Sequence, residues 1–497
     1  MAENTNVAPQ RLFGRKRITT SETAVDFGNI IPVLDKALSI HSTNQFEIEF
    51  LFKYYRGEQP ILSKTKLYRP EINNVIMENH AYEIVNFKTG YVFGDPLQYV
   101  RRGAVSSETA LNSGTEPKDQ TDANAISKSI GDLNEMMTAE SKSVVDKEVA
   151  ECFYICGVGF KGILPDRMAL IDEDESPFEL ECLDPKTTFV VYSSRFGHKP
   201  LMAVQIVSLD DHSSLYCCYT ATHYFEIKER RILTYRAHAL GGIPIIEYVA
   251  NSARMGAFET VIPIMDAINM ITSNRLDGIV QHVQSILKFV NCELDKEQMS
   301  LMSELGAVMV KAVEVGFPAD VDMMSSELDQ MQVQTLVDYL YQTMLAICAM
   351  PDREGSRTST GDTGAAVVLR DGWGAAEAQA KDTEMMFKKS EREFLKIALR
   401  IVKDTRGTDL RTSDIDVKFT RNRTDNLLVK TQGLMNQLKA GIHPQIAIAN
   451  SGLYSDPEQV YLDSLPYLVG PDQIDNSRNY EGDGDGNKLE RDAVSEV

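Results

Sequence analysis

Two long amphipathic segments separated by a short insert constrain the fold of this chain more than any other feature. Apolar residues recur at steps of three and four over residues 256–285, which predicts a helix of roughly 45 Å. Residues 327–349 repeat the pattern. The insert, residues 286–326, reads as a strand, a helix and two further strands. The sequence therefore predicts a small α/β insert at the tip of a helical hairpin.

The part of the chain before this hairpin has a helical region followed by a β-rich region. Residues 31–56 and 71–93 have helical periodicity, and residues 127–156 predict a third, strong helix. The polar residues 104–125 between them are predicted to be a surface loop. Residues 157–249 are rich in Val, Ile, Thr and Tyr, with short polar gaps, and predict an antiparallel β-region.

After the hairpin, Pro351 and several glycines predict a flexible loop over residues 350–363. Residues 364–405 then predict the longest helix, nominally about 60 Å. A bend is expected at its Gly-Trp-Gly triplet, where Trp373 is interpreted as a buried packing anchor. One short strand is predicted at residues 415–420, followed by short helices.

The charge balance is 51 basic against 72 acidic residues, a net charge of −21. Proteins that hold nucleic acid by neutralising phosphates are usually basic, so tight DNA binding is disfavoured, although DNA could slide past such a surface. Residues 1–30 carry Arg11, Arg15, Lys16 and Arg17 and are predicted to be a flexible basic arm. No apolar stretch is long enough for a membrane helix, and the N-terminus has no secretory h-region.

Common enzyme signatures are missing from the sequence. It has no phosphate-binding GxxxxGK[ST], HExxH, GxSxG or kinase motif, and its histidines do not cluster. Seven scattered cysteines without CxxC are interpreted as reduced, mostly buried thiols. We predict no catalytic residue, no metal site and no cofactor. Two alternatives stay open: an enzyme whose site converges from distant segments, and a cytoplasmic scaffold or adaptor.

Two groups of acidic residues are candidate sites. In the C-terminal tail, residues 481–492 match a calcium loop in part, with both end positions substituted, so a solvated acidic tail is the preferred interpretation. The two hairpin segments carry six acids against a single Arg275, and on sequence alone a solvated face is the favoured reading. These six are Glu259, Asp266, Asp277, Glu327, Asp329 and Asp338.

Four stretches, in this order, resemble the portal proteins of tailed bacteriophages, in the subgroup typical of long-tailed phages. The first is YYRGEQPIL with NVIMENHAYEIVNFKTGYVFGDP downstream. The second is GGIPIIEYVANSARMGAFETVIPIMDAIN, continuing into SNRLDGIVQHVQSIL. The third and fourth are GDTGAAVVL and NRTDNLLVKTQGLMNQLKAGIHPQIAIANSGLYSDPEQ. Each motif is weak alone, but the ordered set spans most of the chain.

The resemblance implies an α+β, predominantly helical, elongated subunit whose wing, stem, clip and crown are arranged in a ring, typically of twelve copies. The expected parts are a wing (31–255 and the long helix 364–405), two stem helices (256–285 and 327–349), a clip (286–326), a tunnel loop (350–363), a crown (406–470) and a flexible acidic tail (471–497).

The same resemblance implies a structural, non-enzymatic ring at the unique capsid vertex, through which DNA is packaged and ejected. Implied partners are further copies of the chain, double-stranded DNA, the terminase large subunit, the head–tail adaptor at the clip, and the major capsid and scaffold proteins, with no membrane. The protein would assemble in the host cytoplasm and reside in the virion.

The resemblance also implies two sets of site residues. The six acids of the hairpin would suit a negative bore that repels phosphate, so that DNA slides. The tunnel loop would face DNA, with Arg353 and Arg357 the best candidates for transient contact. Its residues are Asp352, Arg353, Glu354, Gly355, Ser356, Arg357, Thr358, Ser359, Thr360, Gly361 and Asp362.

Overall fold

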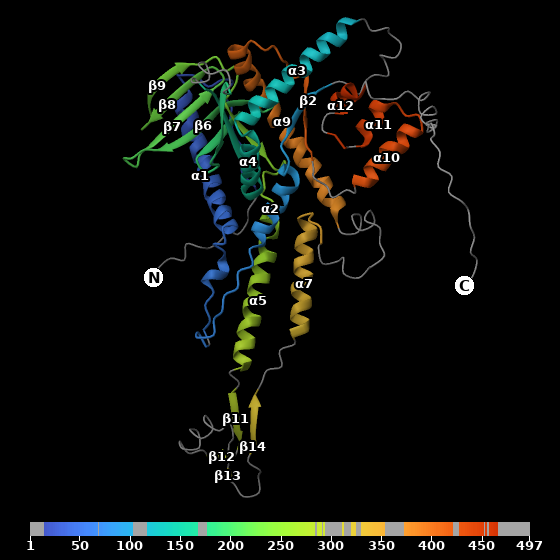
Figure 1. The fold of residues 1–497 in the computed structure, drawn as a ribbon. Coiled ribbons are helices and arrows are strands. Elements are labelled where there is room, and N and C mark those ends of the chain that lie inside the picture. The colour runs from blue at the N-terminus through green and yellow to red at the C-terminus, as the bar shows by residue number, and fades with distance from the viewer. Residues whose placement is uncertain are drawn as a thin grey trace, which may run out of the picture. The chain divides into compact units, whose positions relative to one another are not determined.

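The chain divides into two compact units, Met1–Asn422 and Arg423–Val497. The computed structural model describes residues 14–67, 69–102, 117–166, 176–283, 286–290, 292–293, 311–312, 320–324, 330–352, 372–420, 427–451, 453–454 and 457–465. Helices and sheets both contribute to the larger unit, as the α+β prediction requires (Figure 1).

A six-stranded sheet forms one part of the larger unit. Its strand order is β1 (Ile18–Thr20), β5 (Thr188–Ser193), β6 (Pro200–Ser208), β7 (Ser214–Thr220), β8 (His223–Lys228) and β9 (Arg231–Ala237). Every neighbouring pair is antiparallel except β1 and β5, which are parallel. Alternate residues of β5 and β6, such as Val191 and Val204, join buried residues of helix α1 (Ile30–Tyr55) in one apolar cluster.

A three-stranded antiparallel sheet lies in the main core. Its order is β10 (Ile245–Val249), β3 (Val158–Pro165), β4 (Phe178–Leu183), so the predicted β-region is confirmed. Helices α2 (His80–Phe93), α4 (Lys142–Cys156) and α9 (Trp373–Arg406) contribute to the same core, with aromatic side chains at its centre. A further strand pair joins β2 (Gln98–Arg101) to β15 (Ile415–Lys418).

Four buried charges meet at the centre of this core: Lys142, Asp146, Lys161 and Glu391. The Lys142 and Lys161 ammonium groups lie 2.8 Å and 3.0 Å from the two oxygens of Glu391. Both lysines also contact Asp146. The hydroxyls of Tyr99 and Tyr248 each donate to Glu391 at 2.6 Å. The cluster is neutral and its members satisfy one another, which is the condition under which buried ions are tolerated.

The predicted helical hairpin is present. A 3-10 turn (Glu259–Val261) leads into α5 (Ile262–Val283), and α7 (Gln330–Ile347) packs beside it (Figure 1). Between them, β11 (Ile286–Val290) pairs with β14 (Asp320–Met324), and β12 (Cys292–Glu293) with β13 (Lys311–Ala312), all antiparallel. The helix predicted at residues 295–305 lies outside the described residues.

The N-terminal expectations need correction. Residues 14–30 are no flexible arm, because β1 pairs with β5 and Arg15 is buried. The predicted helix 71–93 begins only at His80, since residues 74–78 are held in extended form, as described below.

The predicted helix 127–156 is two helices. The first, α3 (Pro117–Ala139), takes up the end of the predicted loop 104–125. The second, α4, starts after Ser141, whose φ of 51° is incompatible with a continuous helix.

Two expectations about the long helix also need correction. Helix α9 begins at Trp373, because Gly372 has a φ of 81°, so the glycine triplet marks a helix start and no bend. Trp373 is half-buried. The residues predicted to form the crown, 406–470, divide between the two units, because β15 pairs with β2 of the larger unit. The smaller unit contains the predicted short helices, α10 (Leu427–Lys439), α11 (Pro444–Ser451) and α12 (Pro457–Ser464). The tail 471–497 lies outside the described residues.

Candidate functional site

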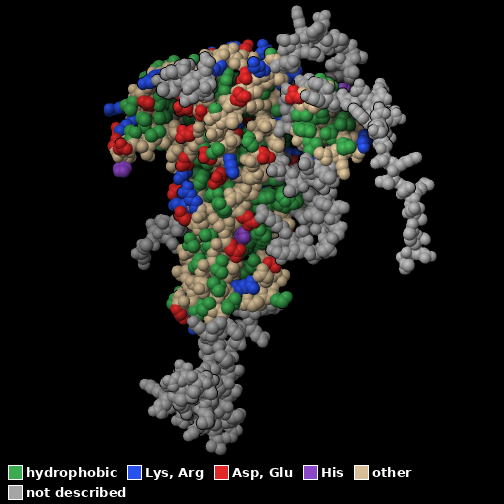
Figure 2. All heavy atoms as spheres, viewed as in Figure 1, with side chains coloured by type: hydrophobic (Ala, Val, Ile, Leu, Met, Phe, Trp, Pro, Cys, Tyr) green, Lys and Arg blue, Asp and Glu red, His purple; other side chains and the backbone are tan. Residues whose placement is uncertain are grey.

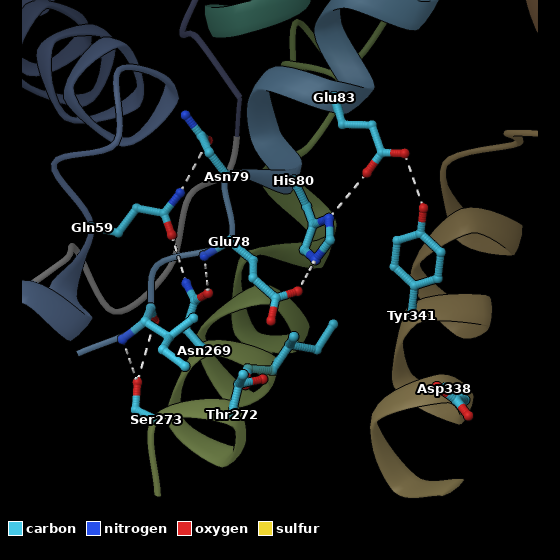
Figure 3. Close-up of polar contacts among 12 residues, drawn as sticks. Gln59, Glu78, Asn79, His80, Glu83, Asn269, Thr272, Ser273, Asp338 and Tyr341 are labelled. Carbon is cyan, nitrogen blue, oxygen red and sulfur yellow. Dashed lines mark hydrogen bonds and ion pairs between the residues drawn. The ribbon is translucent and has the colours of Figure 1, made fainter. Parts of the chain in front are cut away.

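One face of α5 binds an extended stretch of backbone (Figure 3). The Asn269 side-chain oxygen accepts the backbone N–H of Glu78 at 2.8 Å. One turn further, Ser273 accepts the N–H of Ile76 at 2.9 Å and donates to its carbonyl at 3.2 Å. The next turn presents Asp277, which accepts the backbone N–H of residue 74 at 2.7 Å. These three α5 residues form a polar ladder.

The ladder works because two repeat lengths nearly match. Four helical residues rise about 6 Å, and two extended residues span about 6.6 Å. Side chains at positions 269, 273 and 277 therefore meet every second backbone N–H of the segment 74–78. This pairing satisfies donors that a helix would have satisfied internally, which explains why residues 74–78 are extended. The four-residue spacing of the polar residues was the available signal, and the sequence reasoning missed it.

Asp277 also holds two lysines. It lies 2.7 Å from the Lys64 ammonium and 2.5 Å from that of Lys66, and it is only 1% exposed. Burial alone would raise the pKa of this carboxyl. Hydrogen bonds from both lysines and from Asn74 outweigh burial and hold the pKa well below its usual range. Asp277 is therefore an ionised anchor inside the subunit.

Glu259, at the start of the hairpin, is a second internal anchor. It is 5% exposed, lies 3.2 Å from the Arg15 guanidinium and accepts the backbone N–H of Gly256 at 2.6 Å. Burial raises the pKa of Glu259 to about 7, against the lowering effect of Arg15. The pair ties the N-terminal segment to the first turn of the hairpin.

These positions correct part of the predicted channel lining. Glu259 and Asp277 are buried within the subunit, so they do not line a water-filled channel. Asp266 is half-buried and accepts the hydroxyl of Tyr54 at 2.9 Å. Asp338 is exposed on α7. Glu327 and Asp329 lie outside the described residues.

The exposed surface of α5 and α7 is largely uncharged on the face drawn in Figure 2. The exposed residues of the two helices include several large apolar side chains, namely Met270, Ile279, Leu336, Tyr339 and Ile347. A strongly acidic surface is thus not what the two helices present on this face. Leu336, Tyr339 and Ile347 share one side of α7, and Asp338 lies about 160° around the helix from Leu336.

His80 joins the beginning of α2 to α7 (Figure 3). Its two ring nitrogens lie 3.2 Å from a Glu78 oxygen and 3.0 Å from a Glu83 oxygen, and Tyr341 of α7 donates to Glu83 at 2.9 Å. Burial lowers the pKa of His80, but hydrogen bonds with the two carboxylates outweigh it and raise the pKa to about 9. The ring is therefore positively charged at neutral pH. It borders a cavity of about 460 Å³ between α5 and α7.

The predicted tunnel loop is described only at its two ends. Asp352 is half-buried. Residues 353–371, which include all the other residues predicted to face DNA, lie outside the described residues. The ends are adjacent. A Cβ placed on Gly372 would lie 3.5 Å from the Met350 carbonyl oxygen and 3.7 Å from the Pro351 Cα. The chain thus leaves and re-enters the described fold at nearly one point.

Within the described residues, no group of three or more His, Cys, Asp or Glu side chains is arranged to hold a metal ion. None of the described helices combines the length and the apolar character that crossing a bilayer requires. What the described residues of α5 and α7 provide is a set of structural hydrogen bonds and exposed helix surfaces.

A family model described as "Phage portal protein, SPP1 Gp6-like" matches residues 34–463. No curated protein matches the chain. The family match covers the polar ladder, both hairpin helices and the ends of the predicted loop.

Proposed function

The chain belongs to the SPP1 Gp6-like phage portal protein family, and on this premise we propose which of its parts perform the family's function. Portal proteins sit at a capsid vertex and form the channel through which DNA is packaged and ejected, and this is the role of the chain. Family members assemble as ring oligomers with the capsid and the packaging motor as partners. The match over residues 34–463 is the observation that carries this conclusion.

We propose that twelve copies form the ring and that α5 and α7 build its channel wall. The strands β11–β14, between these helices, would form the clip that contacts the head–tail adaptor. The terminase large subunit, the major capsid protein and a scaffold protein are the further partners we propose. Assembly in the host cytoplasm belongs to the same proposal.

The two kinds of exposed surface on α7 support this assignment. Within the described residues, the apolar stripe of Leu336, Tyr339 and Ile347 is exposed, and Tyr339 is 63% exposed. In a ring, such a stripe can pack against a neighbouring copy. Asp338 lies on another side of the helix, at the cavity between α5 and α7, where Gln334 donates to it at 2.6 Å. We propose that the stripe faces a neighbouring subunit and that Asp338 faces the channel.

The ring is tested by the mass and projected shape of the purified protein. Mass photometry and negative-stain imaging should show rings near twelve times the 55.5 kDa subunit. The variant Y339E places a charge in the apolar stripe and should reduce the ring fraction. A monomer or dimer that persists at high concentration and across salt conditions would contradict the proposal.

The channel position of Asp338 is tested by reversing its charge. D338K should slow DNA packaging, and more strongly at low salt, because a cation in the bore attracts phosphate. D132K is the matched control, since Asp132 is an exposed acid on α3. Equal packaging by the two variants would show that Asp338 does not face DNA.

The two alternatives from the sequence, a cytoplasmic scaffold or an enzyme, gain no support from the family match, because portal proteins are structural. The predicted contacts of Arg353 and Arg357 with DNA stay proposals. Packaging assays on their alanine variants test them, with wild-type ring formation as the control.

A further inference from the structure

Lys88 connects three helices that are distant in sequence. It lies on α2 and is 7% exposed. Its ammonium group donates to the carbonyl oxygen of Cys348, at the end of α7, at 2.6 Å. The same group donates to the side-chain oxygen of Gln379, in the second turn of α9. One buried cation thus bridges the end of one helix and the beginning of another.

The partners of Lys88 are neutral, which is unusual for a buried ammonium group. No carboxylate of the described residues lies within ion-pair distance of it. Burial accordingly lowers the pKa of Lys88 to about 8. The position of the Lys88 ammonium group at the end of α7 compensates for the burial of its charge. The last four carbonyls of a helix have no partner within the helix, and they carry its negative dipole end, so a cation there is stabilised.

Other residues of α2 hold the first turns of α9. The Tyr91 hydroxyl donates to Glu377 at 2.9 Å. The rings of Phe87 and Tyr91 lie 6.0 Å and 5.8 Å from the ring of Trp373, the first residue of α9. Because Gly372 lies next to Met350, the described residues just before and just after 353–371 lie against α2 and against each other.

We propose that Lys88 is a positioning residue that clamps the end of α7 to the start of α9, and so sets the point from which residues 353–371 leave and re-enter the fold. Its link to DNA handling rests on the proposed function, in which that segment is the tunnel loop. The clamp itself does not depend on this assignment, because it is defined by contacts between described helices.

The clamp predicts a local spectroscopic signature. Trp373 is the only tryptophan of the chain, so its fluorescence reports on the start of α9. K88M keeps the side-chain length and removes both donated hydrogen bonds. It should shift the emission to longer wavelength and raise the acrylamide quenching constant about twofold, because local opening exposes the indole. K88R, which keeps the charge and donors, should recover much of the wild-type signal.

Two further variants make the test decisive. K53M removes an exposed lysine of α1 and should leave the emission unchanged. Q379L removes one acceptor of the clamp at an exposed position, where the protein should tolerate it, and should shift the emission in the same direction as K88M. If K88M and Q379L both match the wild type in emission and quenching, the clamp is wrong. If K88M does not fold, Q379L alone decides.

A packaging assay then separates the clamp from the proposed function. Rings of K88M should form as in the wild type and package less DNA, because only the loop position has changed. Wild-type protein that forms no rings would overturn the proposed function, whereas the fluorescence comparison would still decide the clamp. Normal packaging by a K88M ring with the shifted emission would overturn the link between the clamp and DNA handling.

Discussion

Replacing Glu391 with glutamine should destabilise the larger unit strongly. Four donors converge on the two oxygens of Glu391: Lys142 and Tyr99 on one, Lys161 and Tyr248 on the other. A glutamine offers one oxygen and one NH₂ group. In either orientation its NH₂ faces a lysine and a tyrosine that also donate, and two buried lysines are left with Asp146 alone.

The expected magnitude follows from this loss of neutrality. Removing one partner of a buried ion pair typically costs about 3–5 kcal/mol, because the remaining charge is uncompensated. The double variant K161M/E391Q has one buried lysine and one buried aspartate, and is neutral again. The two single changes should therefore sum to more than the double change, with a coupling free energy of about 1–3 kcal/mol.

Urea unfolding followed by Trp373 fluorescence and by circular dichroism measures these free energies, since Trp373 and Glu391 share α9. E393Q is the matched control. Glu393 is exposed on the same helix and pairs with exposed Lys396, so its loss should cost less than about 1 kcal/mol. An E391Q midpoint equal to that of E393Q, or strictly additive single effects, would refute the reasoning.

The stability difference between the wild type and E391Q should depend on pH with a definite sign. Burial alone would raise the pKa of Glu391, but Lys142 and Lys161 outweigh burial and hold it below its ordinary 4.5. A depressed carboxyl pKa contributes stability that is present above the unfolded pKa and lost as the pH falls below it. The advantage of the wild type over E391Q should therefore shrink below about pH 4.5.

Three further outcomes are expected. The pKa of His80 is raised from 6.5 to about 9, so its contribution to the free energy of unfolding is present below pH 6.5 and lost as the pH rises through about 9. Urea unfolding of the wild type and of H80Q should show their stability difference falling by about 3 kcal/mol across that window. D277N should speed tryptic cleavage after Lys64, because the ion pair that anchors this residue is lost; unchanged cleavage would contradict the anchor. G157A should yield little folded protein, because its Cβ would lie 2.2 Å from a carbonyl oxygen at a φ of 85°. The matched variant G90A has open space around the added Cβ and should stabilise α2 by up to about 1 kcal/mol in thermal unfolding. Equal yields of folded protein from the two variants would argue against the clash.

The sequence by itself determined the elements whose periodicity is long and local. The apolar repeats around α5 and α7 and the β-rich run before them are confirmed, because burial on one face imposes a period on the residues. The strands at the two ends of the insert, β11 and β14, are also confirmed, because short apolar runs predict them. The family, too, was readable from ordered motifs, and the match over residues 34–463 confirms it.

Only the tertiary structure decided where these elements end and which polar residues are internal. Residues 74–78 are extended because α5 supplies their hydrogen-bond acceptors from a place about 200 residues away in sequence. Asp277 and Glu259 look like surface acids in the sequence, yet basic partners from distant segments bury them. Lys88 gives no signal of its clamp, since its acceptors belong to two other helices. Such contacts depend on the packing of distant segments, which local periodicity does not encode.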